Sequence, residues 1–126
     1  MELNIIRSNK VTVQDIKNML ELDKYELPER TYNYYKQYTN GNDFISIEEC
    51  KKKLIRNVLL GREAPVKVGF EKVRVFYYGC LTIMIDIEDR SFSYIKNEYG
   101  VDYGFKLDIE RRIVLNYILG IKNDKY

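Results

Sequence analysis

The sequence predicts a single α+β domain with three N-terminal helices, an antiparallel meander of three or four strands and a C-terminal helix. Apolar residues recur at helical spacing up to Gly61, whereas after Pro65 they alternate with a period of two. Runs of helices followed by runs of strands are typical of α+β proteins. Because 126 residues is near the commonest size of one domain, we expect 1–126 to fold as one compact unit. Its helical part would span 11–61, and the sheet with its closing helix 65–126.

Capping residues mark the first two helices. Thr12 is a preferred N-cap residue. The apolar residues that follow it at helical spacing are Val13, Ile16, Met19 and Leu20. Pro28 suits the first turn of a second helix, which we expect to run to about Thr39, before a turn at 40–43.

The third helix begins at a capping box, Ser46-Ile47-Glu48-Glu49. Its apolar stripe consists of Ile47, Cys50, Leu54 and Val58. Gly61 suits the end of this helix as a C-cap.

Alternating apolar residues predict the strands. The alternation covers 66–70, 73–77, 81–87 and 92–96, with a turn at 88–91 before the last of them. Asp108 is then expected to cap the closing helix. The residues of that helix expected to face inward are Ile109, Ile113, Tyr117 and Ile118.

The absence of histidine removes the usual acid–base group, most zinc sites and every Ser-His or Cys-His triad. We therefore expect no enzyme activity and no cofactor. Asp86, Glu88 and Asp89, with Lys96, faintly resemble a carboxylate site for Mg²⁺, but acidic residues are far commoner as ordinary turn residues. Gly100 to Gly104 lacks the Gly-Lys-Ser/Thr ending of a phosphate loop.

The location is expected to be cytoplasmic. No apolar run approaches the roughly 18–20 residues that a membrane span needs, and the first ten residues do not form a signal peptide. Cys50 and Cys80 stand alone without CxxC spacing, which is typical of reduced, half-buried thiols.

Charge and tyrosine content bear on the partner. The net charge is +2, and neither half forms the basic block typical of nucleic-acid binding. The 12 tyrosines suit a binding surface, although a lineage bias toward Lys, Asn, Ile and Tyr would raise them equally. Five of them gather around the strands and the following loop and would form a protein-binding face if exposed, or a sheet core if buried: Tyr77, Tyr78, Tyr94, Tyr99 and Tyr103.

Two motifs resemble the winged helix-turn-helix of MerR-type regulators and phage excisionases. They are Arg30-Thr31-Tyr32-Asn33-Tyr34-Tyr35 and Ser46-Ile47-Glu48-Glu49, and the resemblance covers about residues 11–59. It implies a winged-helix-like arrangement in which the second helix reads double-stranded DNA and 40–43 forms the wing.

The residues expected to contact DNA lie on the second and third helices. Those on one face of the second helix, suited to base edges, are Arg30, Asn33, Tyr34 and Gln37. Those suited to phosphates are Lys51, Lys52, Lys53 and Arg56, and Asn42 at the wing could reach a neighbouring backbone. The alternative is a helical hairpin packed on a sheet, with Arg30 and Asn33 simply solvated.

Two functions follow as hypotheses. The first is a DNA-binding accessory regulator, and the second is a protein-binding inhibitor of a host factor or defence system, of the anti-CRISPR kind, acting through the tyrosine-rich surface. Short chains rich in Lys, Asn and Tyr are typical of phages and mobile elements. The partner would be double-stranded DNA or a host protein complex and not a membrane, with a homodimer left open.

Overall fold

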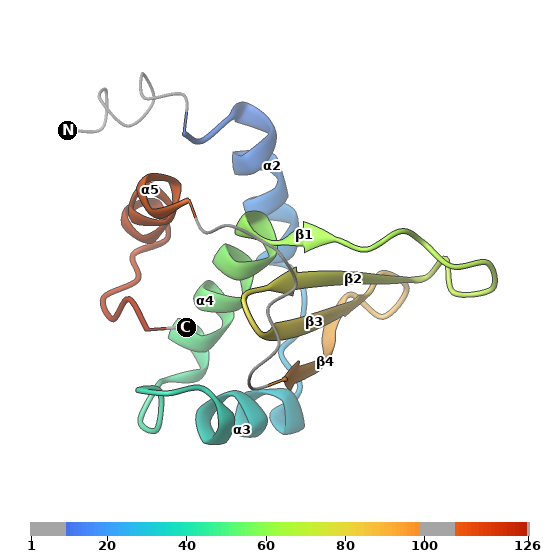
Figure 1. Ribbon diagram of the computed structural model, residues 1–126, viewed down its shortest axis with the longest axis horizontal. Coiled ribbons are helices and arrows are strands. Elements are labelled where there is room, and N and C mark those ends of the chain that lie inside the picture. Colours follow the sequence, from blue (N-terminus) through green and yellow to red (C-terminus); the bar gives the residue numbers. More distant parts are fainter. Residues whose placement is uncertain (1–9, 99–107, 126) are drawn as a thin grey trace.

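The computed structural model describes residues 10–98 and 108–125, which form helices packed on an antiparallel sheet (Figure 1). The helices are α2 (Val13–Leu22), α3 (Glu29–Tyr38), α4 (Ile47–Leu60) and α5 (Ile109–Leu119). The strands are β1 (Arg62–Glu63), β2 (Val73–Tyr78), β3 (Leu81–Asp86) and β4 (Ser91–Asn97). The expected α+β class is confirmed, with helices first, a four-stranded meander next and α5 last. Within the two described ranges, no helix is both long and apolar enough to cross a membrane.

The sheet has the order β1-β2-β3-β4, and every neighbouring pair is antiparallel. Phe76 pairs with Ile83, which in turn pairs with Ile95, so that buried residues lie opposite one another across three strands. One face of the sheet therefore belongs to the core. The other face is only partly covered, which is common in antiparallel sheets.

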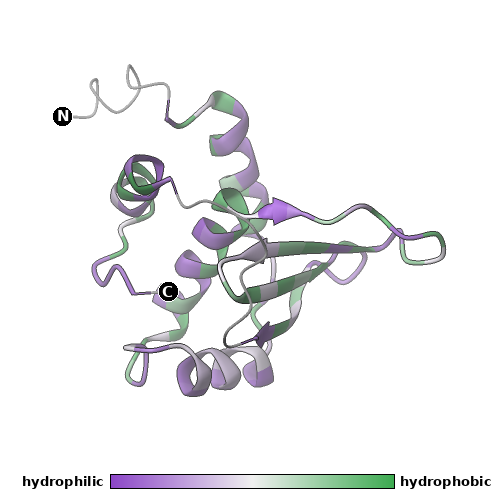
Figure 2. Ribbon diagram, viewed as in Figure 1, coloured by the Kyte–Doolittle hydropathy of each residue, from purple (hydrophilic) through white to green (hydrophobic). Residues whose placement is uncertain are grey.

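The predicted strand at 66–70 is wrong. The ladder between β1 and β2 ends after the hydrogen bond from Ala64 N to Val75 O at 2.8 Å. Pro65 has no N–H to continue it, and residues 65–72 form an exposed connection that we call the arm. The arm extends away from the rest of the molecule in Figure 1, and Figure 2 shows apolar and polar residues mixed along it.

Helix α4 is the central element, because it contacts α2, α3, α5 and β2. Its N-cap is Ser46, as expected, whose Oγ accepts a hydrogen bond from Glu49 N at 3.1 Å. The residues that it buries are Cys50, Lys53, Leu54, Ile55, Arg56, Asn57, Val58 and Leu60. Such a set lies on nearly all sides of the helix, so α4 has no broad polar face toward solvent.

Helix α5 packs through a face other than the predicted one. Ile109, Ile113, Tyr117 and Ile118 are exposed, whereas Leu115 is completely buried. The reason lies in the neighbouring helix α4, because Arg111 donates a hydrogen bond to Leu59 O and Asn116 accepts one from Arg56. The expected N-cap, Asp108, is confirmed by its hydrogen bond from Arg111 N at 3.0 Å.

An ion pair fastens α5 to the start of α2. Arg111 donates to both carboxylate oxygens of Asp15, at 2.8 and 3.1 Å, and to the carbonyls of Lys10 and Leu59. Asp15 also completes a capping box with Thr12. Burial alone would raise the pKa of Asp15, but the hydrogen bonds from Arg111 and Thr12 outweigh it and hold the pKa below its usual value.

We predict that Asp15→Asn lowers the free energy of unfolding by about 1–3 kcal/mol at pH 7, because a half-buried guanidinium loses its counter-charge. Since the folded pKa of Asp15 is depressed, its contribution is present above the unfolded pKa and is lost as pH falls through the folded value. Urea unfolding at pH 7 and at about pH 3 measures both effects. Asp23→Asn, at an exposed position of the same region, serves as the control. The prediction would be contradicted if the two proteins had the same free energy of unfolding at pH 7. It would also be contradicted if the difference between them were as large in acid as at pH 7.

Candidate functional site

The open face of the sheet and the arm form an apolar groove of about 270 Å³. Its lining comprises Ala64, Pro65, Val66, Lys67, Phe70, Val73, Val75, Tyr77 and Met84. Tyr94 lies opposite Met84 in the ladder and is 49% exposed on the same face. Residues of β2 and β3 therefore form the bottom of the groove, and residues of the arm form its side.

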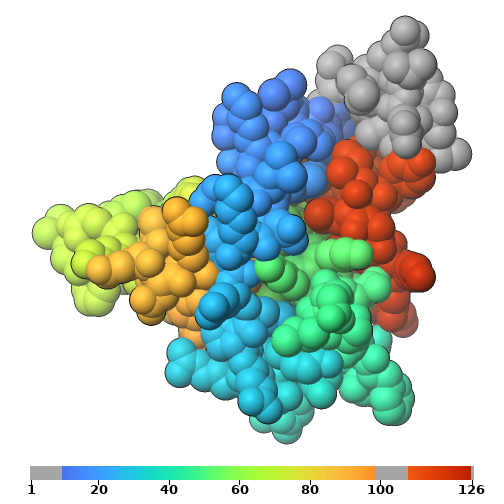
Figure 3. Space-filling model, turned by 180° about the vertical axis from the view of Figure 1, so that it is seen from behind, coloured from blue at the N-terminus to red at the C-terminus, as the bar shows by residue number. Residues whose placement is uncertain are grey.

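The arm itself presents large apolar side chains to solvent. Val68 is 95% exposed and Phe70 is 64% exposed. The tip is shaped by local hydrogen bonds, from Phe70 N to Lys67 O at 3.0 Å and from Gly69 N to a carboxylate oxygen of Glu71 at 2.9 Å. Gly69 has φ of +87°, a conformation that favours glycine. In the view from behind, the arm projects beyond the body of the molecule, beside the β3–β4 turn (Figure 3).

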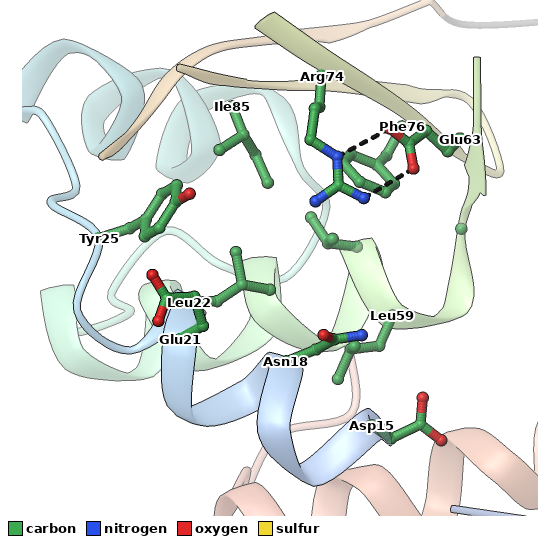
Figure 4. Close-up of a pocket in the computed structure, with 12 residues that line it drawn as sticks. Asp15, Asn18, Glu21, Leu22, Tyr25, Leu59, Glu63, Arg74, Phe76 and Ile85 are labelled. Carbon is green, nitrogen blue, oxygen red and sulfur yellow. Dashed lines mark hydrogen bonds and ion pairs between the residues drawn. The ribbon is translucent and has the colours of Figure 1, made fainter. Parts of the chain in front are cut away.

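A second hollow, of about 300 Å³, lies between α2, the end of α4 and the core side of β2 (Figure 4). Leu22, Leu59 and Ile85 provide apolar walls, and the polar residues around them are Asp15, Asn18, Glu21, Glu63 and Arg74. We call this hollow the α2 cleft.

The charges around the α2 cleft are already paired. Arg74 donates to both oxygens of Glu63, at 2.8 and 2.7 Å, as the dashed lines in Figure 4 show. The hydrogen bonds from Arg74 hold the pKa of Glu63 below its usual value, and those to Glu63 raise the pKa of Arg74. The guanidinium also lies over the ring of Phe76, 5.1 Å from its centre. These groups offer shape and polarity for binding rather than an unpaired acid or base.

Cys50 is a candidate nucleophile, and the acidic residues Asp86 and Glu88 are candidate metal ligands. Cys50 is buried, and the two acids already have partners. Burial raises the pKa of the Cys50 thiol to about 12, so that it stays protonated and unreactive. Asp86 accepts a hydrogen bond from Asp89 N at 2.9 Å, and Glu88 pairs with Lys72 at 2.8 Å. Across the described ranges, no three His, Cys, Asp or Glu residues gather as a metal site would require.

Helix α3, the expected DNA-reading helix, lies along the outer edge of β4. Arg30 is exposed but donates to Ser93 O at 3.1 Å, and Thr31 donates to Phe92 O at 2.9 Å. The half-buried Tyr34 accepts a hydrogen bond from Asn97 N at 2.8 Å. Side chains of α3 thus satisfy backbone groups of an edge strand. Asn33 and Gln37 are exposed, and with Arg30 they share the outer side of the helix.

The expected phosphate contacts lie on α4 and are mostly turned inward. Lys51 is half-buried and donates to Asp23 O, and Lys52 is also half-buried. Arg56 and Lys53 are fully buried, so Arg56 is not on a surface that could meet a phosphate backbone. The expected wing residue Asn42 is also not available to DNA, because it is buried and accepts a hydrogen bond from Lys53. These side chains are buried because α4 is surrounded by α2, α3, α5 and β2.

The predicted tyrosine surface divides between the two sides of the sheet. Tyr77 and Tyr94 lie on the open face, whereas Tyr78 is 2% exposed and belongs to the core. Adjacent residues of a strand point to opposite faces, so Tyr77 and Tyr78 could not both join one surface. Tyr99 and Tyr103 lie outside the described residues. The arm residue Val68 was missed as a surface residue, because its alternation with Val66 suggested a strand.

Comparisons with known proteins found one family. Residues 25–117 match the family model described as YorE. The chain is 30% identical over 107 residues to the SPbeta prophage-derived uncharacterized protein YorE of Bacillus subtilis strain 168, covering 79% of this chain and 85% of that protein. No solved structure matches the chain. The similarity confirms the expected phage-type class, and the winged helix-turn-helix stays a prediction.

We predict that Tyr34→Phe destabilises the fold by about 1–2 kcal/mol, because the half-buried amide of Asn97 loses its acceptor. Chemical denaturation and hydrogen exchange at the Asn97 amide measure this effect. Tyr117→Phe, which removes a hydroxyl from an exposed residue of α5, is the matched control. Unchanged protection of the Asn97 amide would show that Tyr34 does not hold the β4 edge.

Proposed function

The chain belongs to the YorE family, and we propose that it is a non-enzymatic phage-type protein that binds a partner protein through the open face and the arm. The observation that carries the proposal is the exposure of large apolar side chains around an apolar groove. Contiguous apolar surface of this kind marks interaction sites on soluble proteins.

The energetics favour burial of this surface. Covering a fully exposed Val or Phe side chain contributes roughly 1.5–3 kcal/mol, so Val66, Val68 and Phe70 together could supply several kcal/mol of binding energy. Tyr94 adds an aromatic side chain with a polar tip, a residue type enriched at binding hot spots. Lys67 and Glu71 provide charges of both signs at the rim, which suits a protein surface of mixed charge.

A protein partner fits this surface better than nucleic acid does. DNA is held largely through cationic contacts to phosphates, and the arm and open face carry apolar side chains with balanced charge. A chain with a net charge of +2 also gives little general attraction to a polyanion.

DNA binding is the second candidate, because Arg30, Asn33 and Gln37 share the exposed side of α3. Their side chains can hydrogen-bond to guanine and adenine edges. The bond between Arg30 and Ser93 O is at an exposed position and would have to exchange for one to a base.

For the protein partner, we predict that Val68→Asp with Phe70→Asp lowers recovery of a stoichiometric partner from host lysate by at least about tenfold, because a charge would be buried in an apolar contact. The purified partner would then bind wild type in calorimetry and fail to bind the double variant. Phe44→Asp, at a fully exposed apolar residue of the α3–α4 turn, should leave binding unchanged. Equal loss with Phe44→Asp, or no loss with the arm variant, would reject the arm as the contact.

For the DNA candidate, we predict that Arg30→Ala weakens duplex binding about tenfold and that affinity falls steeply as salt increases. Fluorescence anisotropy with labelled duplex at about 50 mM salt, where charge contacts are strongest, measures both. Lys17→Ala removes one exposed positive charge from α2 and is the control for general electrostatics. The absence of duplex binding by wild type under these conditions would exclude the candidate.

A further inference from the structure

A buried cluster of cations lies between α4 and α5, away from the arm. Lys53 and Arg56 are both completely buried, and the side chain of Arg112 is 12% exposed. Lys53 has a neutral partner, Asn42 Oδ1 at 2.6 Å. Buried cations normally require counter-charges, because desolvation disfavours the charged form.

One carboxylate, that of Asp124, reaches both arginines. Its Oδ1 lies 2.8 Å from Arg112 Nε and 3.5 Å from Arg56 Nη1, and it also accepts a hydrogen bond from Asn116 Nδ2. Asn116 Oδ1 in turn accepts from Arg56 Nη1 at 2.9 Å. Every one of these contacts to the carboxyl group uses the same oxygen, and the Asp124 side chain is 63% exposed. The donors are therefore arranged around a point where one anionic oxygen sits.

Asp124 belongs to residues 120–125, which we call the strap and which run back beside α4 (Figure 1). The strap begins at Gly120, the C-cap of α5, whose φ is +72°. Outside the arginines and Asn116 Nδ2, three hydrogen bonds anchor residues 121–125 to the rest of the described chain. Ile121 N donates to Asn116 O at 2.9 Å, Lys122 N donates to Glu49 Oε1 at 2.8 Å, and Asn123 Nδ2 donates to Gly41 O at 3.3 Å. A segment with so few anchors can be displaced without unfolding the core.

The cluster keeps unused donor capacity. Arg56 Nη2 is buried and has no hydrogen-bond partner among the described residues. Buried donors of this kind are rare and need an explanation. Burial, and to a lesser extent the nearby Arg56, lowers the pKa of Lys53 to about 8. The site thus has more cationic and donor groups than Asp124 can satisfy.

We propose that Arg56, Arg112 and Asn116 form a binding site for an oxyanion, a phosphate or carboxylate group, and that Asp124 of the strap occupies this site until a ligand displaces it. Arginines favour such groups because the guanidinium presents several N–H donors in one plane. The tethered Asp124 carboxylate competes at high effective concentration, so the intact chain binds a free anion weakly. The site is separate from the arm and the open face, and it does not rest on the proposed function.

The test uses inorganic phosphate and acetate as probes, with sodium chloride at matched ionic strength. We expect Asp124→Ala to melt at a lower temperature than wild type and to recover with phosphate or acetate but not with chloride, because ligand binding stabilises the folded state. Affinity of Asp124→Ala for phosphate should exceed that of wild type by on the order of tenfold, because the internal competitor is gone. Recovery with phosphate alone would identify a phosphoryl ligand, and recovery with both probes a general oxyanion; each supports the proposal.

Two further variants keep the test decisive. Adding Arg112→Gln to Asp124→Ala should abolish the response to both probes, and circular dichroism checks that the double variant is folded. Asp89→Ala, which removes an exposed acid from the β3–β4 turn, should behave as wild type. A folded Asp124→Ala protein that responds equally to phosphate, acetate and chloride would overturn the proposal, as would an undiminished response in the double variant.

Discussion

The burial of α4 with its charged residues is the constraint that organises the rest of the molecule. A helix enclosed on nearly all sides would ordinarily be apolar, yet this one carries Lys53 and Arg56 into the core. Segments on either side of α4 supply partners for them. The α3–α4 turn offers Asn42 to Lys53, while α5 and the strap bring Asn116 and Asp124 to Arg56. The polar face of α5 consequently points inward, and its isoleucines are left in solvent.

The edge of β4 imposes a second constraint. An uncovered edge strand exposes backbone groups that invite pairing with another chain. Here Glu26, in the segment before α3, forms two backbone hydrogen bonds at the start of β4: its N donates to Arg90 O, and its O accepts from Phe92 N. Further along β4, Thr31 donates a hydrogen bond to Phe92 O and Tyr34 accepts one from Asn97 N. The same helix that resembles a DNA-reading element therefore has a structural task on its inner side, and only its outer side is free for recognition.

These two constraints leave the open face of the sheet and the arm as an exposed apolar surface. Because the ladder with β1 ends at Pro65, the arm does not pair with the sheet, and its residues Val66, Val68 and Phe70 are exposed. The α2 cleft lies on the other side of the sheet, and its charged groups pair among themselves. We propose the open face and the arm as a protein-binding surface, and the buried arginine cluster as a second, chemically different ligand site.

The sequence by itself determined the types and order of the elements, except that it predicted a strand at 66–70 in place of β1 at Arg62–Glu63. Capping residues such as Thr12 and Ser46 act through neighbours only a few positions away, so local chemistry was enough to locate the helix starts. The change of apolar period from helical to two likewise predicted the meander. The open-face placement of Tyr77 also follows from strand parity, once Tyr78 is assigned to the core.

Only the tertiary structure decided which faces pack and which side chains are hidden. Arg56 lies on a helix with apolar residues on several sides, so its spacing could not tell a solvated cation from one enclosed by Asn116 and Asp124, 60 and 68 positions away. The inward face of α5 and the release of the arm depend on partners equally distant in sequence. Local sequence patterns indicate which secondary structure a segment can form, whereas the burial of a side chain depends on residues distant in sequence that pack around it.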